Sequence, residues 1–590
     1  MQTIDERVQA LRTIMKREGL DGWIINGTDP HQSEYVCPRW RTRAWISGFT
    51  GSAGTVVITQ DQALLWVDSR YFIQGAKQIE HSCYTLMKLD TPDVLDPITW
   101  ISKSMPKNSK IGIDQSTLMV SVREKMEKDF SGNKITLVAT PDYLDEIWDD
   151  RPAVPNTALI QLADDVAGYS RLQKMTMVRL AMVQKSCNYT LLSSLDDIAW
   201  LTNLRGNDVA YNPVFLSYLL VGTDKAWLFT EPARFSSELL AVVGEELEIV
   251  PYEKASKTIA SVIGEKDTVY INPDKTNLMV FEALKKAKTV TGRDFSTDLK
   301  ACKNETELEG MRRSHLLDGI ALVNFLSRLD TKAPTYDEQA ISDRLLEQRL
   351  RNKECLGESF GPISGFGEHG AMCHYSATKE SSSAINKSGL LVLDTGGMYE
   401  FGMTDVTRTI LFGEATEEQK HDYTLVLKGN LALGAARFPQ GTCGYQLDIL
   451  ARQFLWQNGM TFFHGTGHGV GFRLNVHEGP QVINTKPIDV PLKPGMVISD
   501  EPGVYKEGRH GIRIENLVAV KQDVKTEFGQ FYSFEVLTLC PFERKLIDKG
   551  LLTDQEVLLV DTYHQWVYDE LKDLVDPEAL QYLEAATRPL

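Results

Sequence analysis

The strongest constraint on the fold of this chain is a set of acidic residues placed inside apolar, strand-like runs of its C-terminal half. The runs LLVLD and TDVTRTILF carry Asp394 and Asp405, VISDEPGVY carries Glu501, and GIRIENLVAV carries Glu515. An ionised carboxylate is rarely left unpaired in a protein interior, because its desolvation is costly. The chain must therefore fold so that these acids meet positive charge, either from arginines or from bound cations.

The two aspartates are predicted to lie side by side on a hairpin. Gly396, Gly397 and Gly402 lie between the two strand-like runs and permit the chain to turn back. Such a hairpin brings Asp394 next to Asp405, and two carboxylates that close repel each other unless protons or cations lie between them. Taken alone the pair is weak support for a site, since aspartates at strand ends are commonly solvated.

A histidine-bearing loop follows the hairpin in the sequence. The segment FFHGTGHGVGF holds His464 and His468 among the glycines Gly465, Gly467, Gly469 and Gly471. Glycine allows the backbone to bend sharply or to approach a ligand, and histidine is the commonest metal ligand. One loop histidine would ordinarily be a surface group, whereas two in a glycine-rich loop after an aspartate hairpin favour a metal site.

Together these residues form a predicted oxygen-rich ligand set, which consists of Asp394, Asp405, His468, Glu501 and Glu515. Four carboxylates and one imidazole suit a pair of Mn²⁺-like ions better than a structural zinc, which prefers thiolates and imidazoles. Two divalent ions would balance the four negative charges in an enclosed site. The alternative stays open that Arg513, Arg473 or Arg408 neutralises these acids in buried salt bridges.

The length of the chain, 590 residues, exceeds what one hydrophobic core supports, so several domains are expected. The sequence WDDRPAVP interrupts any regular element and is interpreted as a linker. A long amphipathic helix is predicted to open the last unit. We therefore expect domains at residues 1–150, 151–303 and 304–590.

The first two domains resemble each other in sequence. Trp45 in RAWISGFTGSAG and Trp200 in IAWLTNLRG begin comparable stretches, and Asp61 and Asp224 each precede a comparable apolar strand. We interpret this as a weak internal repeat of one α/β unit. The competing interpretation is that any two α/β domains offer such coincidences.

Composition limits the possible functions. The chain has 63 Lys and Arg against 80 Asp and Glu, and its formal net charge of −17 argues against nucleic-acid binding. Its eight cysteines are scattered singly, which excludes a compact thiolate zinc site and does not suggest a disulfide framework. The N-terminus lacks the apolar core of a signal peptide, and no apolar run is long enough to span a bilayer. A soluble, cytoplasmic protein without a membrane or nucleic-acid partner is expected.

The C-terminal half resembles the pita-bread metallopeptidases, which include methionine aminopeptidase, prolidase and aminopeptidase P. The segments DTGGMYEFGMTDVTRT, HGTGHGVG, EPGVY and GIRIEN match the motifs of that family, in the same order along the chain. The departures at Thr395, Met398 and Val504 touch no proposed ligand. Four motifs in order make a chance match very improbable.

The resemblance implies a role for each member of the ligand set. Asp394 is expected to chelate one ion, His468 and Glu501 the other, and Asp405 and Glu515 to bridge both. A hydroxide between the two metals is then the expected nucleophile, because each cation lowers the pKa of bound water. Glu501 is the expected proton shuttle.

Three further histidines have spacings that resemble those of the proline-specific branch of the family. His374 and His477 are expected to hydrogen-bond the peptide carbonyl or stabilise the reaction intermediate, and His464 to shape the substrate pocket. The alternative is that these are ordinary core or surface histidines.

The domain organisation favours one branch, the long, three-domain cytosolic aminopeptidase P type. The segments DPHQSEY, ISGFTGSAGT and VDSRYFIQGAKQ resemble its first domain, so the resemblance covers essentially the whole chain. It implies an α/β and α+β multidomain fold: two similar N-terminal α/β domains of the creatinase N-terminal, ribonuclease H-like type, followed by a C-terminal pita-bread catalytic domain. Arg70 is expected to reach the far end of the substrate or a partner subunit's site, although a solvated or salt-bridged arginine is the alternative.

The function implied is release of the N-terminal residue from peptides with proline in the second position. The resemblance also implies a homodimer. Two alternatives remain at this stage: a prolidase that acts on Xaa-Pro dipeptides, and a non-catalytic pita-bread binding protein.

Overall fold

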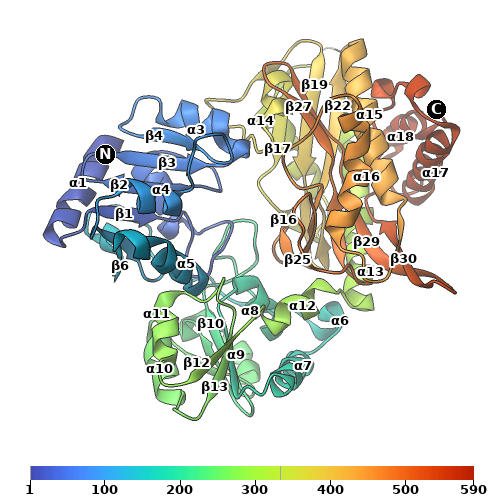
Figure 1. The fold of residues 1–590 in the computed structure, drawn as a ribbon. Coiled ribbons are helices and arrows are strands. Elements are labelled where there is room, and N and C mark those ends of the chain that lie inside the picture. Colours follow the sequence, from blue (N-terminus) through green and yellow to red (C-terminus); the bar gives the residue numbers. More distant parts are fainter. Residues whose placement is uncertain (1, 333) are drawn as a thin grey trace. The chain divides into compact units, whose positions relative to one another are not determined.

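The computed structural model describes residues 2–332 and 334–590. These residues divide into two compact units, Met1–Ala163 with Tyr169–Ser296, and Asp164–Gly168 with Thr297–Leu590 (Figure 1). Both N-terminal repeats lie in the first unit, and the three-domain division stays a prediction. None of the described helices combines the length and the apolar character required to cross a lipid bilayer.

The first half of the first unit is a six-stranded sheet with helices. Its elements are α1 (Ile4–Arg17), β1 (Gly22–Ile25), α2 (Thr42–Ser47), β2 (Thr55–Thr59), β3 (Ala63–Val67), α3 (Phe72–Ile79), β4 (Thr85–Lys88), α4 (Pro97–Ser104), β5 (Lys110–Asp114), α5 (Val120–Phe130) and β6 (Thr136–Thr140). The strand order is β4-β3-β2-β1-β5-β6.

The second half of this unit repeats the architecture. Its elements are β7 (Ile160–Gln161), α7 (Arg171–Gln184), β8 (Tyr189–Leu192), α8 (Leu195–Thr202), β9 (Leu204–Arg205), β10 (Tyr218–Gly222), β11 (Ala226–Phe229), α9 (Ser237–Gly244), β12 (Glu248–Val250), α10 (Ala255–Val262), β13 (Thr268–Ile271), α11 (Leu278–Phe281) and β14 (Lys288–Thr291). The strand order of its main sheet is β12-β11-β10-β8-β13-β14.

The two sheets match strand for strand. In each, the first strand pairs antiparallel with the second and parallel with the fifth, and the third pairs parallel with the fourth. Trp45 lies in α2 and Trp200 in α8, which are the equivalent helices between the first and second strands. In both halves the helix before the first strand of the main sheet has a capping box, from Thr3 in α1 and from Ser170 in α7. The predicted internal repeat is therefore confirmed.

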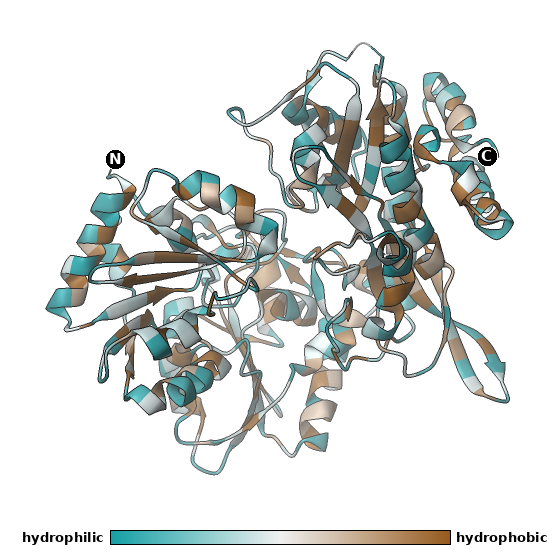
Figure 2. Cartoon of the chain, turned by 45° about the horizontal axis from the view of Figure 1, so that its top comes forward, coloured by the Kyte–Doolittle hydropathy of each residue, from teal (hydrophilic) through white to brown (hydrophobic). Residues whose placement is uncertain are grey.

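Helices pack on both faces of the first sheet, so its strands are apolar on both sides. In the first sheet, α1 packs on the face that carries Val56 and Ile58, whereas α4 and α5 pack on the opposite face with Val57 and Trp66. Successive residues of a strand point to opposite faces, so a strand covered on both sides must be apolar throughout. Figure 2 shows this concentration of apolar residues in the strands of the first sheet.

The helices of the second unit are α6 (Asp164–Ala167), α13 (Glu305–Ser327), α14 (Glu338–Arg349), α15 (Glu417–Gly434), α16 (Gly444–Gln457), α17 (Asp554–Leu571) and α18 (Pro577–Thr587), and α12 (Phe295–Ala301) spans the boundary of the two units. Its strands are β15 (Tyr336–Asp337), β16 (Cys355–Glu358), β17 (Ile363–Phe366), β18 (Ala384–Ile385), β19 (Gly389–Thr395), β20 (Gly397–Tyr399), β21 (Gly402–Met403), β22 (Val406–Phe412), β23 (Arg437–Pro439), β24 (Gly467–Gly469), β25 (Glu478–Ile483), β26 (Val497–Asp500), β27 (Gly503–Lys506), β28 (His510–Arg513), β29 (Asn516–Thr526) and β30 (Gly529–Val536).

Two sheets form the centre of the second unit. One has the order β17-β19-β22 and the other β23-β30-β29-β26-β24-β25. Leu391 and Leu393 of β19 pack with α13 and α14, whereas Leu390 packs with α15 and the β27–β28 hairpin. By the alternation of a strand, Asp394 shares the face of Leu390. The apolar layers on both faces thus fix the side to which this carboxylate points.

Candidate metal centre

The two aspartates lie at neighbouring ends of two adjacent, antiparallel strands, as predicted. β19 pairs with β22 so that Asp394 is opposite Thr407, and Asp405 immediately precedes β22. The connection forms a small ladder of its own, β20 with β21. A Cβ atom on Gly402 would lie 2.5 Å from Ser314 Oγ of α13. This predicted turn glycine is thus also needed for close packing against a helix.

His468 and Glu501 come from the second sheet. His468 is the middle residue of β24, and Glu501 directly follows β26. The two strands pair through Gly469 and Ile498. A Cβ atom on Gly467 would lie 1.9 Å from Ser499 O, so the glycine-rich sequence lets β24 approach β26 closely.

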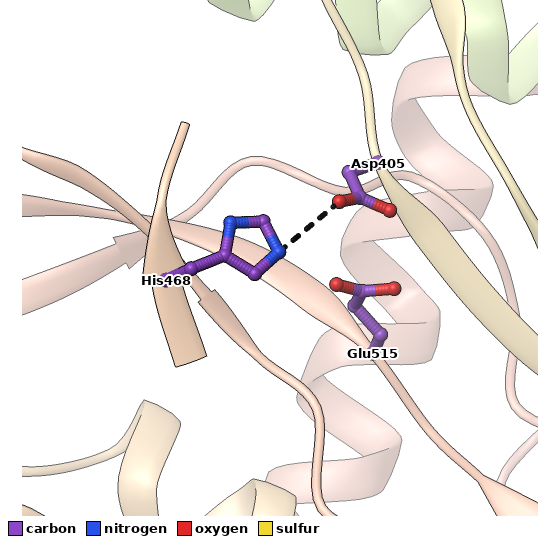
Figure 3. A group of neighbouring side chains, drawn as sticks. All are labelled: Asp405, His468 and Glu515. Carbon is purple, nitrogen blue, oxygen red and sulfur yellow. Dashed lines mark ion pairs between the residues drawn. The ribbon is translucent and has the colours of Figure 1, made fainter. Parts of the chain in front are cut away.

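Ligand atoms of Asp405, His468 and Glu515 all lie within 4.8 Å of one another (Figure 3). His468 Nε2 lies 3.5 Å from Asp405 Oδ2 and also 3.5 Å from Glu501 Oε1. His468 Nδ1 lies 2.9 Å from Gly469 O, and because a carbonyl only accepts, Nδ1 carries the proton. In the neutral ring the lone pair of Nε2 then faces two carboxylates, which requires a cation or a second proton between them.

Three of the carboxylates carry the electrostatic signature of an enclosed acidic cluster. Burial, and then the charges of Glu515 and Asp394, raise the pKa of Asp405 well above its usual range. Burial and the charges of Glu501 and Asp394 do the same to the pKa of Glu515. Burial also raises the pKa of Glu501, although Arg513 opposes that shift. Without a cation, the raised pKa values favour binding of protons by this cluster.

Among the described residues, Arg513 pairs with one of the four acids, Asp394. Arg513 Nη2 lies 2.6 Å from Asp394 Oδ2. Asp394 Oδ1 is buried and has no hydrogen-bond partner among the described residues. Arg408 instead donates to carbonyl oxygens, including that of Glu515 at 2.6 Å. The free oxygen of Asp394 and the lone pair of His468 fit a hard divalent cation.

His464 reaches this centre through a tyrosine that the sequence did not single out. His464 Nε2 lies 2.8 Å from the hydroxyl of Tyr505, and Arg513 Nη1 donates to the same hydroxyl at 2.6 Å. The structure thus connects His464 to Asp394 through Tyr505 and Arg513. Only the place of Tyr505 at the end of the EPGVY motif could have suggested this link.

The other candidate residues lie in different settings. The ring of His477 contacts that of His468, with centroids 4.3 Å apart. His374 is partly buried in the loop after the short helix η8 (Gly367–Ala371). Arg70 belongs to the first unit and holds both carboxylate oxygens of Asp68, at 2.9 and 2.8 Å. The roles given to these three residues stay predictions.

Four segments of the chain match known families. Residues 309–522 match metallopeptidase family M24, and residues 530–590 match the C-terminal region of that peptidase. Residues 7–147 and 150–307 each match the creatinase/prolidase N-terminal domain. The duplicated sheets of the first unit therefore correspond to two copies of one domain family.

Individual relatives match over 63% to 100% of the chain. A Sordaria macrospora protein named Probable Xaa-Pro aminopeptidase P is 41% identical over 93% of this chain and 93% of its own length. A crystal structure of a Caenorhabditis elegans X-prolyl aminopeptidase, described as a cytosolic enzyme with a di-nuclear active site, has a TM-score of 0.95, is 32% identical and covers 100% of both chains. A Bacillus anthracis Xaa-Pro dipeptidase shares the fold alone, with 23% identity, a TM-score of 0.51, and cover of 63% of this chain and 99% of that one.

The predicted fold class and family are thus confirmed: two creatinase-type α/β domains precede a pita-bread domain. The chain belongs to metallopeptidase family M24, among the relatives named Xaa-Pro aminopeptidase P.

Proposed function

We propose that this chain is a metal-dependent aminopeptidase that releases the N-terminal residue from peptides with proline in the second position. The observation that carries the proposal is the convergence of Asp405, His468 and Glu515 within 4.8 Å. Convergence of this kind in a chain that matches aminopeptidase P relatives over its full length favours a working peptidase. A non-catalytic relative would be expected to have lost part of the ligand set.

The proposed metal ligands are Asp394, Asp405, His468, Glu501 and Glu515. A pair of divalent ions bound there would supply an activated water and would polarise the scissile carbonyl. The carboxylate-rich composition favours Mn²⁺ over zinc. The hydrogen bond from His468 Nδ1 to Gly469 O supports this role, because it leaves Nε2 as the ligand atom.

The remaining steps fall to side chains around the cluster. Glu501 is the proposed proton shuttle, and Ser499 Oγ, 3.2 Å from Glu501 Oε1, orients it. His374 and His477 are proposed to hydrogen-bond the peptide carbonyl and the developing oxyanion. The free amino group of the substrate is attracted by the acidic cluster, which fixes the cleavage position at the first residue.

Selectivity for proline follows from the substrate. A bond to proline is a tertiary amide without an N–H, and the residue before proline is restricted in conformation. A site that grips the N-terminus and accepts the pyrrolidine ring, with His464 shaping the pocket, needs no hydrogen bond from that amide.

Further proposals rest on resemblance. We propose a homodimer in the cytoplasm, with Arg70 directed to the far end of the substrate or to a partner subunit's site. In the structure Arg70 donates from Nε and Nη2 to Asp68. A role in substrate binding therefore requires that the remaining N–H groups of the Arg70 guanidinium contact the substrate.

Comparison of an Xaa-Pro dipeptide with an Xaa-Pro-Xaa tripeptide tests the proposal. Purified protein is stripped with a chelator, reconstituted with Mn²⁺, and assayed on both substrates. We expect cleavage of the tripeptide, loss of activity on chelation, and a higher kcat/KM for the tripeptide. A clear preference for the dipeptide would make the chain a prolidase, and no cleavage of either would support a binding protein.

A further inference from the structure

A buried glutamate outside the metal cluster gathers four hydrogen-bond donors. Glu338, the first residue of α14, is fully buried. Its carboxylate accepts from Phe366 N at 2.7 Å, from Ser383 N at 2.8 Å, and from the ring Nδ1 of His369 at 2.9 Å. The hydroxyl of Tyr375 lies 2.8 Å from Glu338 Oε2. An ionised carboxylate is stable in such a place only because several donors replace its water.

All four donors belong to one stretch of the chain, residues 366–383. Phe366 ends β17, His369 lies in η8, and Tyr375 and Ser383 lie in the loop that follows. This stretch has little regular structure to hold its shape after η8. Backbone hydrogen bonds such as Tyr375 N to Met372 O and Ser382 N to Thr378 O close only local turns. Glu338 is the common anchor that joins the separate parts of this loop to α14.

The anchored loop carries His374 between two fixed neighbours. On one side, Cys373 O accepts from Arg513 Nη2 at 3.3 Å, and the same guanidinium holds Asp394. On the other side, Tyr375 is held by Glu338. The residue before His374 is thus attached to the metal cluster through Arg513, and the residue after it is attached to α14 through Glu338.

Close packing beneath η8 fixes the start of the same loop. A Cβ atom on Gly511 of β28 would lie 1.7 Å from Gly370 O, so the backbones of η8 and β28 touch. The ring of Tyr375 also lies 4.4 Å from that of His369. The loop is held on both sides, and the ring of Phe366 at its start also lies in one apolar cluster with Ile341 and Leu345 of α14.

We propose that Glu338 and Tyr375 are positioning residues that hold the His374 loop in its reactive place at the metal cluster. The proposal rests on the role of His374 given under the proposed function. Removal of a Tyr375 or Glu338 contact lets His374 shift by up to about 1 Å, which lowers kcat while the metals stay bound. A displacement of about 1 Å in a catalytic group can lower the rate by about 100-fold.

The experiment is a double-mutant cycle on the Mn²⁺-loaded, full-length enzyme with an Xaa-Pro-Xaa substrate. Tyr375→Phe removes one hydroxyl and keeps the ring, and Glu338→Gln keeps the shape but turns an amide N–H₂ towards donors. Each is combined with His374→Ala. Glu347→Gln, on the exposed face of the same helix, is the matched control. Melting temperature, metal content, kcat and KM are recorded for every variant.

We expect Tyr375→Phe to lower kcat about 10-fold and Glu338→Gln about 100-fold, with metal content unchanged. In the His374→Ala background neither change should lower kcat further, because the group they position is absent. Additive losses in that background would overturn the proposal and leave these residues a structural role only. If His374→Ala alone left kcat unchanged, the proposed function of His374 would fail instead. If Glu338→Gln lowers the melting temperature strongly, the kcat values of Tyr375→Phe with and without His374→Ala still test the proposal.

Discussion

Neutralising one carboxylate of the cluster should stabilise the metal-free protein while it abolishes function. Glu515 is 1% exposed, and its ligand oxygen lies within 4.8 Å of that of Asp405. Glu515→Gln keeps the size of the side chain, and its amide oxygen can still accept from Thr407 Oγ1, which now lies 2.8 Å from Glu515 Oε2. The substitution therefore removes a charge with little change in packing.

The magnitude follows from the separation of the two charges. Two unit charges 4.8 Å apart repel by about 3 kcal/mol at an effective dielectric constant of about 20. The wild-type chain can relieve this repulsion only by binding protons, which costs about 1.4 kcal/mol for each pH unit above the pKa. We expect Glu515→Gln to stabilise the metal-free protein at pH 8 by up to about 3 kcal/mol, or roughly 5 °C in the melting temperature.

The pH dependence has a definite sign. The folded-state pKa values of Asp405, Glu501 and Glu515 are raised above their usual range. At pH values between the unfolded-state pKa and the folded-state pKa, the folded chain therefore binds more protons than the unfolded chain. The stability that these groups contribute is present below the unfolded pKa, near 4, and is lost as the pH rises through the raised values. The advantage of Glu515→Gln should therefore shrink towards pH 5.

Thermal unfolding of chelator-stripped protein at pH 5 and pH 8 measures these effects. Glu527→Gln, which removes the same charge from an exposed turn, serves as the control and should leave the melting temperature unchanged. Added Mn²⁺ should stabilise the wild type and not the Glu515→Gln variant. An equal or lower melting temperature for metal-free Glu515→Gln at pH 8 would refute the reasoning, because the acids would then not repel each other.

Three further outcomes are expected. Glu501→Gln should abolish turnover without unfolding the protein, as circular dichroism and a tripeptide assay would show, and full activity would remove its role as proton shuttle. Arg513→Met leaves Asp394 as an unpaired buried charge, so it should lower the stability of the metal-free protein by about 3 kcal/mol and added metal should recover part of the loss; no loss on chemical denaturation would contradict this. Arg349→Met breaks a fully buried pair with Asp318, 2.7 Å long, and should cost about 3–5 kcal/mol with or without metal, whereas a metal-dependent loss would indicate a link to the site.

The sequence predicted the parts of the fold that follow from local pattern and motif order. The two repeats that contain Trp45 and Trp200 each form a six-stranded sheet, and the two sheets have the same topology. The aspartate hairpin was predicted because Gly396 and Gly402 separate two apolar runs, and the strands pair as expected. These features depend on neighbours in the sequence, which is why a single sequence discloses them.

Contacts between distant segments could not be predicted in the same way. Arg513 was a candidate partner for the glutamates, yet it pairs with Asp394, 119 positions away in the sequence. Glu338 lies in none of the motifs, and Tyr505 lies in the EPGVY motif without being a candidate site residue. Their importance comes from tertiary packing, which brings single polar atoms into reach and leaves no periodic signal in the sequence.

The most direct test of the account is the number of metal ions that each chain binds. Elemental analysis of Mn²⁺-reconstituted protein should give about two ions per chain in the wild type and fewer in Asp405→Asn, since Asp405 is proposed to bridge both ions. Activity should fall with the metal content. Full activity of a chain that binds no divalent ion, or unchanged metal content and activity in Asp405→Asn, would contradict the central claim that these side chains converge to hold a catalytic metal pair.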